Sequence, residues 1–558
     1  MNEKTSGSVA KMNVSDHGLK QHDLKVSTVV FMIFCLVAAG AYGIEEMIPE
    51  AGPGLTIIML IVLPFVWSTP FSLVAAELGS ARPQEGGYYK WVQEACGEFW
   101  GFQAGWWRTI SIYVDQTLYV VLAGGYLAST WDLSWSMEFL AKVVIILFFT
   151  WINIRGVRDV GMVSTILSIL VIVAFAMVAI IGFTHWSHNP MIPMTPEPIT
   201  SPVDWIFYIG AGISLGMWMY SGYESMSTIA GEVSNPQVIP KATLITVPLI
   251  MAVYILPTVA GLGSLGDWPN WGTTAGTVGY ATVAETFMGP AFGVFFAIVA
   301  ILAQCSIYNT YIASGSRGFF ALADDNLAPP ILVRCDKKHG VPYVAVLSVA
   351  IVNLILCSFE FTTIIVIDVF LLVASYVMVF ISALILRKKI PDSERPFKIP
   401  GGYGFLLVLC ILPMFIAFAS YFINGTDFFI GGMMGIISGP IMYIIWRKMY
   451  GGLSKKDPIA FPKNEKTGLA VGDMKRIAAT FIGLGCIGVL GSVWLPWYEG
   501  DWGPEYYAEE YGSGLFASFD GMINAIFIAT IISFIVGVIC AIVAVKVEPK
   551  KDQKKQIK

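Results

Sequence analysis

The sequence predicts an all-α protein that crosses a membrane many times. Of its 558 residues, 56% are hydrophobic and only 13% are charged, about half the charged fraction of an ordinary soluble domain. Apolar runs of about 20 residues recur along the chain, which is the length that a helix needs to cross the hydrocarbon core of a bilayer. Lys and Arg residues fall in alternate loops between these runs, and this alternation indicates how many times the chain crosses.

Fourteen apolar runs fit this length, and we expect each to form one membrane span. An even number of spans returns both termini to the same side of the membrane. The runs cover residues 26–48, 54–80, 98–128, 137–154, 158–184, 203–231, 240–264, 281–314, 343–358, 361–387, 403–423, 427–448, 474–494 and 516–546.

The distribution of basic residues supports this count. Lys and Arg concentrate at the termini and after even-numbered spans, as at Arg155, Lys241 and Arg387. Because cytoplasmic loops carry the excess of Lys and Arg, both termini are expected in the cytoplasm of a cell whose plasma membrane holds the protein. No Lys or Arg occurs in the opposite loops, which are residues 185–201, 265–280, 424–427 and 495–515.

The spans are expected to form a twelve-span body followed by a final pair. The body contains two five-span halves that are candidates for an inverted repeat. The expected parts are a cytoplasmic tail at 1–25, the body at 26–448 with its repeats at about 26–184 and 203–387, a polar linker at 449–473, the last two spans within 474–546, and a basic tail at 547–558.

The loop between the last two spans, Trp494–Gly514, is both acidic and aromatic. Its carboxylates could gather cations by electrostatic attraction. The favoured interpretation is a solvated loop that Trp and Tyr residues anchor at the membrane interface. The acidic residues of the loop are Glu499, Asp501, Glu505, Glu509 and Glu510.

Two spans carry glycines beside carboxylates, at Gly40–Glu46 in the first and Ser221–Glu224 in the sixth. Freed backbone groups are costly in lipid, so such interruptions are expected only where they line a cavity. Glycines alone would be explained by close helix packing, but packing does not explain the adjacent carboxylates. The two spans open the two candidate halves, and paired broken helices of this kind indicate a transporter site near the midplane.

The ionisable residues within the spans are mostly acidic, which favours a cationic solute or protons over an anion. A carboxylate in an apolar site also takes up a proton more readily than one in water, so one of them can carry a coupling proton. The residues in question are Glu45, Glu46, Glu77, Arg108, Asp115, Glu224, Glu285 and Asp368.

The candidate site is therefore built from the two breaks and one mid-membrane carboxylate. Tyr42 and Tyr223 flank the breaks and are expected to stack on an ammonium group by cation–π attraction. The candidates for proton coupling are Glu45, Asp115 and Glu224. The candidate substrate-binding residues are Gly40, Ala41, Tyr42, Gly43, Glu45, Asp115, Ser221, Gly222, Tyr223 and Glu224.

Other classes of function find little support. All five His residues lie outside the predicted spans, and the eight Cys residues include no CxxC pair. We therefore expect no enzyme activity, metal site, cofactor or nucleic-acid partner. The expected partners are a small amine or amino acid substrate, protons and the lipid bilayer.

Several motifs resemble those of a known group of transporters. Glu77–Gly79, Pro83–Tyr88 and Gly97–Phe102 resemble the signature of spans 2 and 3 in the amino acid–polyamine–organocation superfamily. Ile229–Pro236 resembles the signature of its spans 6 and 7. The resemblance covers about residues 25–450 and implies a five-plus-five inverted-repeat core, described as LeuT-like, that works by alternating access.

A closer resemblance is to the polyamine–proton symporters of plants and protozoan parasites. It rests on Gly43–Glu46, Tyr223–Thr228 and Pro391–Phe397. It implies that Glu224 recognises a substrate amine. Two departures stand out: an amide associated with recognition in some members is Gly222 here, and the last two spans exceed the usual twelve.

Together these features predict proton-coupled uptake of a polyamine or related organic cation, with Glu224 and Glu45 holding ammonium groups. An amino acid permease, either a symporter or an exchanger, is the alternative. In that case the backbone N–H groups around Gly40–Gly43 would bind the substrate carboxylate and Glu224 would bind the amine. A membrane sensor built on a transporter fold is a minor alternative.

Overall fold

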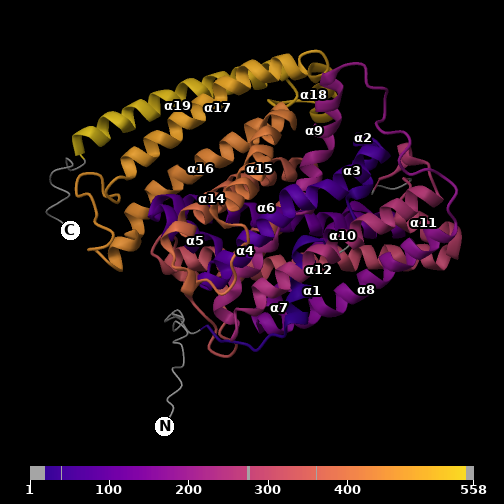
Figure 1. The fold of residues 1–558 in the computed structure, drawn as a ribbon, viewed down its shortest axis with the longest axis horizontal. Coiled ribbons are helices and arrows are strands. Elements are labelled where there is room, and N and C mark those ends of the chain that lie inside the picture. The colour runs from indigo at the N-terminus through magenta and orange to yellow at the C-terminus, as the bar shows by residue number, and fades with distance from the viewer. Residues whose placement is uncertain (1–18, 39–40, 273–276, 360, 548–558) are drawn as a thin grey trace, which may run out of the picture.

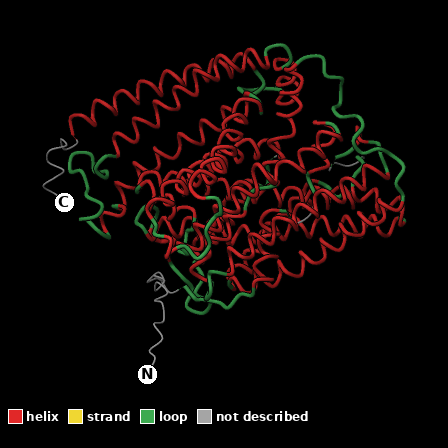
Figure 2. The backbone as a smooth tube through the Cα atoms, in the orientation of Figure 1, coloured by secondary structure: helices red, strands yellow, loops and turns green. Residues whose placement is uncertain are grey.

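The computed structural model describes residues 19–38, 41–272, 277–359 and 361–547. In this part of the chain the regular elements are helices joined by loops, with no strand (Figure 2). Large apolar side chains such as Phe415, Val493 and Val545 are exposed on the outside of the bundle. Eleven described helices are long and apolar enough to cross a membrane, and the chain is a multi-pass membrane protein.

Each predicted span coincides with one helix or a consecutive group of helices. The corresponding elements, in chain order, are α1 (Val26–Val37) with α2 (Ile44–Ala51), α3 (Pro53–Leu63) with η1 (Pro64–Ser68) and α4 (Thr69–Ala81), α6 (Glu98–Trp131), α7 (Trp135–Arg155), α8 (Val157–Thr184), α9 (Pro202–Met219) with η2 (Tyr223–Glu232), α10 (Val238–Ser264), α11 (Tyr280–Met288) with α12 (Pro290–Asp324), α13 (Tyr343–Leu356), α14 (Phe361–Lys389), α15 (Gly402–Ile423), α16 (Thr426–Tyr450), α17 (Asp473–Glu499) and α19 (Phe519–Val547).

The predicted breaks in spans 1 and 6 are confirmed. The first lies between α1 and α2 and ends at Gly43, whose φ is +96°. The second lies between α9 and η2 and ends at Gly222, whose φ is +109°. A side chain is strained at such angles and glycine is not, so each glycine lets the chain turn between two half-helices. Gly40, which was also predicted here, lies outside the described residues.

The predicted eighth span, 281–314, differs in the structure. The chain forms the short helix α11, turns at Gly289 with a φ of +96°, and then continues as α12 as far as Asp324. Pro290 occupies the first position of α12, where a missing N–H costs nothing. The hydrophobic run alone did not reveal this turn, because apolar residues continue on both sides of it.

Two ends of the bundle can be distinguished. The described chain begins and ends toward the left of Figure 1, whereas α2, α11 and α18 (Gly503–Tyr511) lie toward the right. We refer to these as the terminal end and the distal end. At the terminal end, the amphipathic helix α5 (Tyr88–Cys96) joins α4 to α6.

The last two spans pack against each other and along the body. In Figure 1, α17 and α19 run side by side beside α16. Tyr443 of α16 donates hydrogen bonds to Glu98 of α6 at 3.0 Å and to Asp473 of α17 at 2.5 Å. Asp473, the last residue of the predicted linker, is therefore tied to the body.

The expectation of a solvated loop after α17 is wrong for part of that loop. Residues Gly503–Tyr511 form the helix α18, Tyr507 is buried, and Glu499 is fully buried at the end of α17. Glu499 accepts hydrogen bonds from Thr426 of α16 and from Tyr507. The loop is thus partly folded against the body, while Glu505, Glu509 and Glu510 remain exposed.

Candidate functional site

A buried ion pair lies next to the break in span 6. Arg108 extends from α6, and its Nε lies 2.6 Å from Oε1 of Glu224 in the first turn of η2. Both side chains are only 1% exposed. The guanidinium also donates to Ser111 at 2.9 Å and to Ser225 at 3.1 Å. A buried charge pair is tolerated when hydrogen bonds satisfy its remaining donors, as they do here.

Tyr376 of α14 completes the environment of Glu224. Its hydroxyl donates to Oε2 of Glu224 at 2.6 Å and accepts a hydrogen bond from the backbone N–H of Gly222 at 2.8 Å. The Tyr376 ring stacks on Phe71 of α4 with 3.8 Å between centroids. Both oxygens of Glu224 are therefore held, and Tyr376 connects the broken span directly to spans 2 and 10.

Asp115 lies two turns beyond Arg108 on α6 and is 2% exposed. Its Oδ1 accepts a hydrogen bond from Nε1 of Trp218, on α9, at 3.0 Å. Tyr119 stacks on the Trp218 ring with 5.7 Å between centroids. The donors around Asp115 are neutral groups, and it forms no ion pair with a described basic residue.

Asp368 of α14 is fully buried in the same region. Its neighbours are Ser111, Asp115 and Arg108. Neither of its carboxylate oxygens has a hydrogen bond of normal geometry among the described residues, although the Ser111 hydroxyl lies close enough to interact with the carboxylate. An ionised carboxylate in this position is very costly, whereas a protonated one is far less so.

Three carboxylates thus share one guanidinium. When all four groups are ionised, the positive charge of Arg108 leaves a net charge of −2 from Glu224, Asp115 and Asp368. Among the ion pairs of the described residues, only the one between Arg108 and Glu224 lies within this group. Protons or a cationic ligand can supply the missing positive charge.

A cavity of about 440 Å³ adjoins this group on the distal side of the breaks. We call it the main cavity. It brings the break in span 1 next to Trp218, whose indole is hydrogen bonded to Asp115. Five of its fifteen lining residues are aromatic, which suits an organic cation. It is lined by Val37, Ala38, Tyr42, Gly43, Glu46, Glu50, Tyr119, Leu122, Tyr126, Leu215, Trp218, Met219, Tyr254, Gln304 and Ile307.

Glu45 faces a second, smaller cavity of about 140 Å³. Its Oε1 accepts a hydrogen bond from the backbone N–H of Tyr280 at 3.1 Å, while Oε2 is buried without a partner among the described residues. Tyr42 borders both cavities, and its buried hydroxyl likewise has no described partner. Tyr42 and Tyr126, which both line the two cavities, therefore separate Glu45 from the main cavity.

The predicted candidates divide into two groups. Tyr42 and Gly43 line the main cavity, Glu45 lines the small one, and Asp115 lies behind Trp218. The remaining described candidates lie away from these cavities. Ala41 is fully buried. Ser221 accepts a hydrogen bond from Trp67, and the Tyr223 hydroxyl accepts one from Ser68. Gly222 and Glu224 are both hydrogen bonded to the Tyr376 hydroxyl.

Sequence reasoning missed two features of the site. Tyr376 was not singled out, and Arg108 was not matched with Glu224. The only signal in the sequence was the presence of one mid-membrane arginine among several carboxylates, because a buried arginine needs an acidic partner. Nothing in the sequence told which carboxylate that partner was.

Buried ion pairs close the terminal side of the bundle. Arg317 of α12 binds Glu232 at 2.6 Å and 3.1 Å, and Glu77 pairs with Arg387 and Arg395. Glu85, in the loop before α5, accepts a hydrogen bond from Gly231 N at 2.9 Å. Burial, reinforced by the nearby Glu232 carboxylate, raises the pKa of Glu85 well above its ordinary value.

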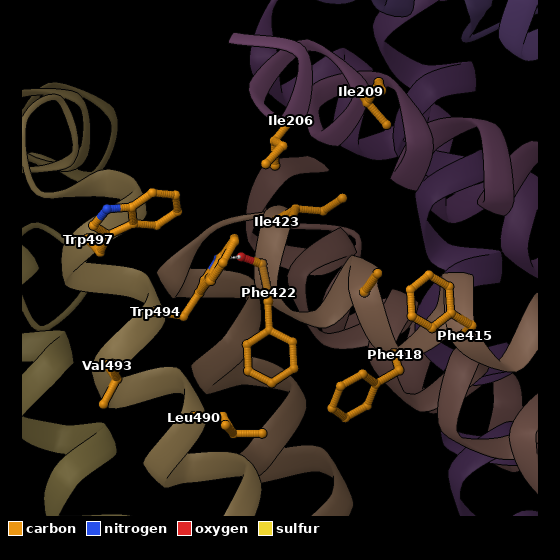
Figure 3. Close-up of a pocket in the computed structure, with 11 residues that line it drawn as sticks. Ile206, Ile209, Phe415, Phe418, Phe422, Ile423, Leu490, Val493, Trp494 and Trp497 are labelled. Carbon is orange, nitrogen blue, oxygen red and sulfur yellow. Dashed lines mark hydrogen bonds between the residues drawn. The ribbon is translucent and has the colours of Figure 1, made fainter. Parts of the chain in front are cut away.

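A larger cavity of about 710 Å³ lies apart from this site, in the seam between α9, α15 and α17. Figure 3 shows Phe415, Phe418, Phe422 and Trp494 around it, with the Trp494 indole donating to the carbonyl of Phe422 at 2.7 Å. Its lining has no charged residue. It is suited to hydrocarbon rather than to a polar solute.

Comparison with known proteins places the chain in a family. Residues 24–445 match the family model described as amino acid permease, which spans the helix breaks and the whole group around Arg108. The chain belongs to the amino acid permease family.

Relatives of this permease include transporters with different named substrates. It is 30% identical over 395 residues to the polyamine transporter RMV1 of Arabidopsis thaliana, covering 70% of this chain and 78% of that protein. It is 24% identical over 442 residues to the serine/threonine exchanger SteT of Bacillus subtilis (strain 168), covering 77% of this chain and 98% of that protein.

The fold of this permease is also found in a solved structure. The crystal structure of MhsT in complex with L-phenylalanine aligns with a TM-score of 0.57 at 16% sequence identity, covering 74% of this chain and 100% of that chain. The inverted-repeat, LeuT-like architecture predicted from the paired breaks is confirmed.

Proposed function

We propose that this permease is a secondary active transporter that takes up polyamines or related organic cations together with protons. The observation that carries the proposal is the charge of the buried group. Arg108 balances only one of three carboxylates, and Asp115 and Asp368 have no described cationic partner. A cationic substrate and a proton can both supply that charge within the membrane.

The main cavity, which Glu46 and Glu50 line, and the two carboxylates just beyond its walls form the proposed substrate site. Glu45 lies on the far side of Tyr42, and Asp115 lies directly behind Trp218. An extended diamine could place one ammonium near each carboxylate while its methylene chain lies against the aromatic walls. Ammonium groups bind well over aromatic faces and beside carboxylates in such partly desolvated sites.

Glu224 takes a different part in this arrangement. Both of its oxygens are occupied by Arg108 and Tyr376, so an ammonium would have to displace Arg108 to bind it. We propose that Glu224 instead positions Arg108 beside Asp115 and Asp368. The Tyr376 hydroxyl, which is hydrogen bonded to both Glu224 and Gly222, links this ion pair to the break in span 6. The predicted direct contact with the amine then belongs to another state of the transport cycle.

Asp368 is the proposed proton carrier. A buried carboxylate without a hydrogen-bond partner is stable in its neutral form, and the Asp115 carboxylate nearby adds to the preference for binding a proton. A substrate ammonium at Asp115 and a proton on Asp368 would together supply the two positive charges that Arg108 leaves missing. Both cations can then be bound at once and carried inward together.

The orientation follows from the basic residues. Those after even-numbered spans, such as Arg155 and Arg387, belong to the terminal end, so we propose that this end faces the cytoplasm of a cell whose plasma membrane holds the protein. The main cavity lies on the distal side of the breaks, and buried pairs such as Arg317–Glu232 close the terminal side. The structure then corresponds to a state that receives solute from outside.

An amino acid substrate is the second candidate. It is favoured by the match to the serine/threonine exchanger, of which the chain covers 98%. The N-terminal turns of α2 and η2 present N–H groups that could bind a substrate carboxylate. The amine would then lie near the same carboxylates as the proposed polyamine.

Competition for uptake separates these candidates. Purified protein in liposomes should accumulate labelled putrescine when an inward proton gradient is applied. Unlabelled spermidine should compete strongly, and serine or phenylalanine should compete weakly. If the neutral amino acids compete and the diamines do not, the polyamine proposal is wrong and the amino acid candidate replaces it.

A further inference from the structure

A second chamber of about 440 Å³ lies at the distal end, beyond the main cavity. We call it the distal chamber. It shares Glu50, Leu215 and Trp218 with the main cavity, so the two adjoin across these residues. The distal chamber is lined by Glu50, Phe207, Gly210, Ala211, Ser214, Leu215, Trp218, Ile423, Asn424, Gly425, Asp427, Phe428, Tyr498, Trp502, Tyr506 and Tyr507.

The last two spans build one wall of this chamber. Tyr498 belongs to α17, Trp502 to the turn after it, and Tyr506 and Tyr507 to α18. These residues lie outside the part of the chain that matches the amino acid permease family, which ends at residue 445. This aromatic wall of the chamber is therefore built from a part of the chain beyond the family match, while the rest of the lining lies within it.

The wall is fixed firmly to the body. Oε2 of the buried Glu499 accepts hydrogen bonds from the Thr426 hydroxyl at 2.7 Å and the Tyr507 hydroxyl at 2.8 Å. Trp502 packs on Phe207 of α9, with 5.5 Å between ring centroids. Since α9 is the distal half of broken span 6, the C-terminal pair contacts a helix that also borders the main cavity.

The chamber has the chemistry of an ammonium site. Its carboxylates are Glu50, on α2, and Asp427, at the start of α16. Asp427 is 4% exposed and accepts hydrogen bonds from the Tyr511 hydroxyl at 2.6 Å and from the backbone N–H of Phe428 at 2.8 Å. These donors are neutral, so they leave its negative charge uncompensated. The lining contains no Lys or Arg.

We propose that the distal chamber is a second binding site, at which an organic cation binds before it reaches the main cavity, and that the C-terminal pair supplies its aromatic wall. Glu50 and Asp427 attract the ammonium groups, and Trp502 and Tyr506 cover the carbon chain. Trp218 forms the boundary through which the solute passes inward. The chemical class of the ligand rests on the proposed function, whereas the existence of the chamber does not.

Protection of an introduced thiol tests this proposal. Tyr506→Cys places a thiol in the chamber, and Glu509→Cys places one on the exposed side of the same helix as the matched control. Each variant is labelled in proteoliposomes with a membrane-impermeant cationic methanethiosulfonate, with and without putrescine. Wild-type protein gives the background from the native cysteines, including the exposed Cys486.

Putrescine should slow the labelling of Tyr506→Cys severalfold and leave that of Glu509→Cys unchanged. Adding Glu50→Gln or Asp427→Asn should raise the half-protecting concentration about two- to fivefold, as expected for losing one partly exposed ion pair. Glu50 is exposed, so Glu50→Gln keeps the test informative even if Asp427→Asn does not fold.

Equal labelling of Tyr506→Cys with and without putrescine would overturn the proposal. So would equal protection by serine, because a site for cations must reject a zwitterion. Protection is measured independently of transport. Protection without putrescine uptake by the wild-type protein would therefore contradict the proposed function and leave the distal chamber as a cation site.

Discussion

Nε of Arg108 lies 2.6 Å from Oε1 of Glu224, which joins the unbroken helix α6 to the 3₁₀ segment that follows the break in span 6. The pair is buried and has further hydrogen bonds to Ser111, Ser225 and Tyr376. It holds the segment that follows the break in span 6 against the unbroken helix α6. Its integrity should matter for both folding and transport.

Removing one partner of this pair should destabilise the protein. Glu224→Gln removes the one described ion-pair partner of Arg108, and breaking a buried ion pair typically costs roughly 3–5 kcal/mol. We expect a lower thermal unfolding temperature in detergent and no putrescine uptake. The double variant Arg108→Gln with Glu224→Gln should recover part of the stability and none of the transport. If each single variant is as stable as the wild type, the pair does not hold the break together.

Asp368→Asn should separate transport from the proton gradient. Asparagine resembles a protonated aspartate in shape and cannot titrate, so the variant should fold normally because neither oxygen has a described partner. Putrescine uptake should continue down its own gradient and lose its stimulation by an inward proton gradient. The control is Asp501→Asn, in the exposed distal loop. Undiminished stimulation in Asp368→Asn would exclude Asp368 as the proton carrier.

The ring of Tyr42 should matter more than its hydroxyl. The hydroxyl is buried without a described hydrogen-bond partner, while the ring separates the two cavities. Tyr42→Phe should therefore transport almost normally. Tyr42→Ala loses a cation–π contact worth about 2 kcal/mol when desolvated, or roughly thirtyfold in KM. Initial rates over a range of putrescine concentrations measure this difference. A larger defect in Tyr42→Phe than in Tyr42→Ala would contradict it.

Asp325 should make the stability of the terminal end depend on pH. Its burial opposes ionisation, but the ammonium groups of Lys90, at 2.5 Å, and Lys456, at 3.0 Å, lower its pKa to about 2. The folded-state pKa lies below the unfolded value of 3.8. The stabilisation is therefore complete above about pH 4 and is lost as the pH falls through about 2.

Asp325→Asn should accordingly cost about 1–2 kcal/mol between pH 5 and 8. The difference in the free energy of unfolding between this variant and the wild type should become smaller below pH 4. Thermal unfolding in detergent at several pH values measures this, with the exposed Asp520→Asn as control. A difference that stays constant down to pH 3 would show that the charge of Asp325 is not what stabilises this end.

Much of the fold could be predicted from the sequence because membrane spans follow directly from apolar length and from the positions of Lys and Arg. Gly43 and Gly222 also marked the two breaks, since only glycine adopts their positive φ without strain. The turn at Gly289 escaped notice because it lies between two apolar segments that together have the length of one span.

The side-chain partners within the site could not be predicted. A membrane helix is apolar on nearly all sides, so its sequence pattern does not say which face meets which neighbour. Arg108 and Glu224 are 116 residues apart, and Tyr376 lies a further 152 residues beyond Glu224. Their meeting depends on the rotation of three helices. The folding of α18 onto Asp427 was likewise invisible in a loop whose composition resembles that of a solvated segment.

A cationic amine and a proton are proposed to enter together through one acidic site. Proteoliposomes that contain a pH-sensitive dye in the lumen, in sodium-free buffer, show whether they do. Addition of external putrescine should acidify the lumen of vesicles with wild-type protein and should not do so with Asp368→Asn. Putrescine entry without any lumenal acidification in the wild type would rule out proton-coupled uptake.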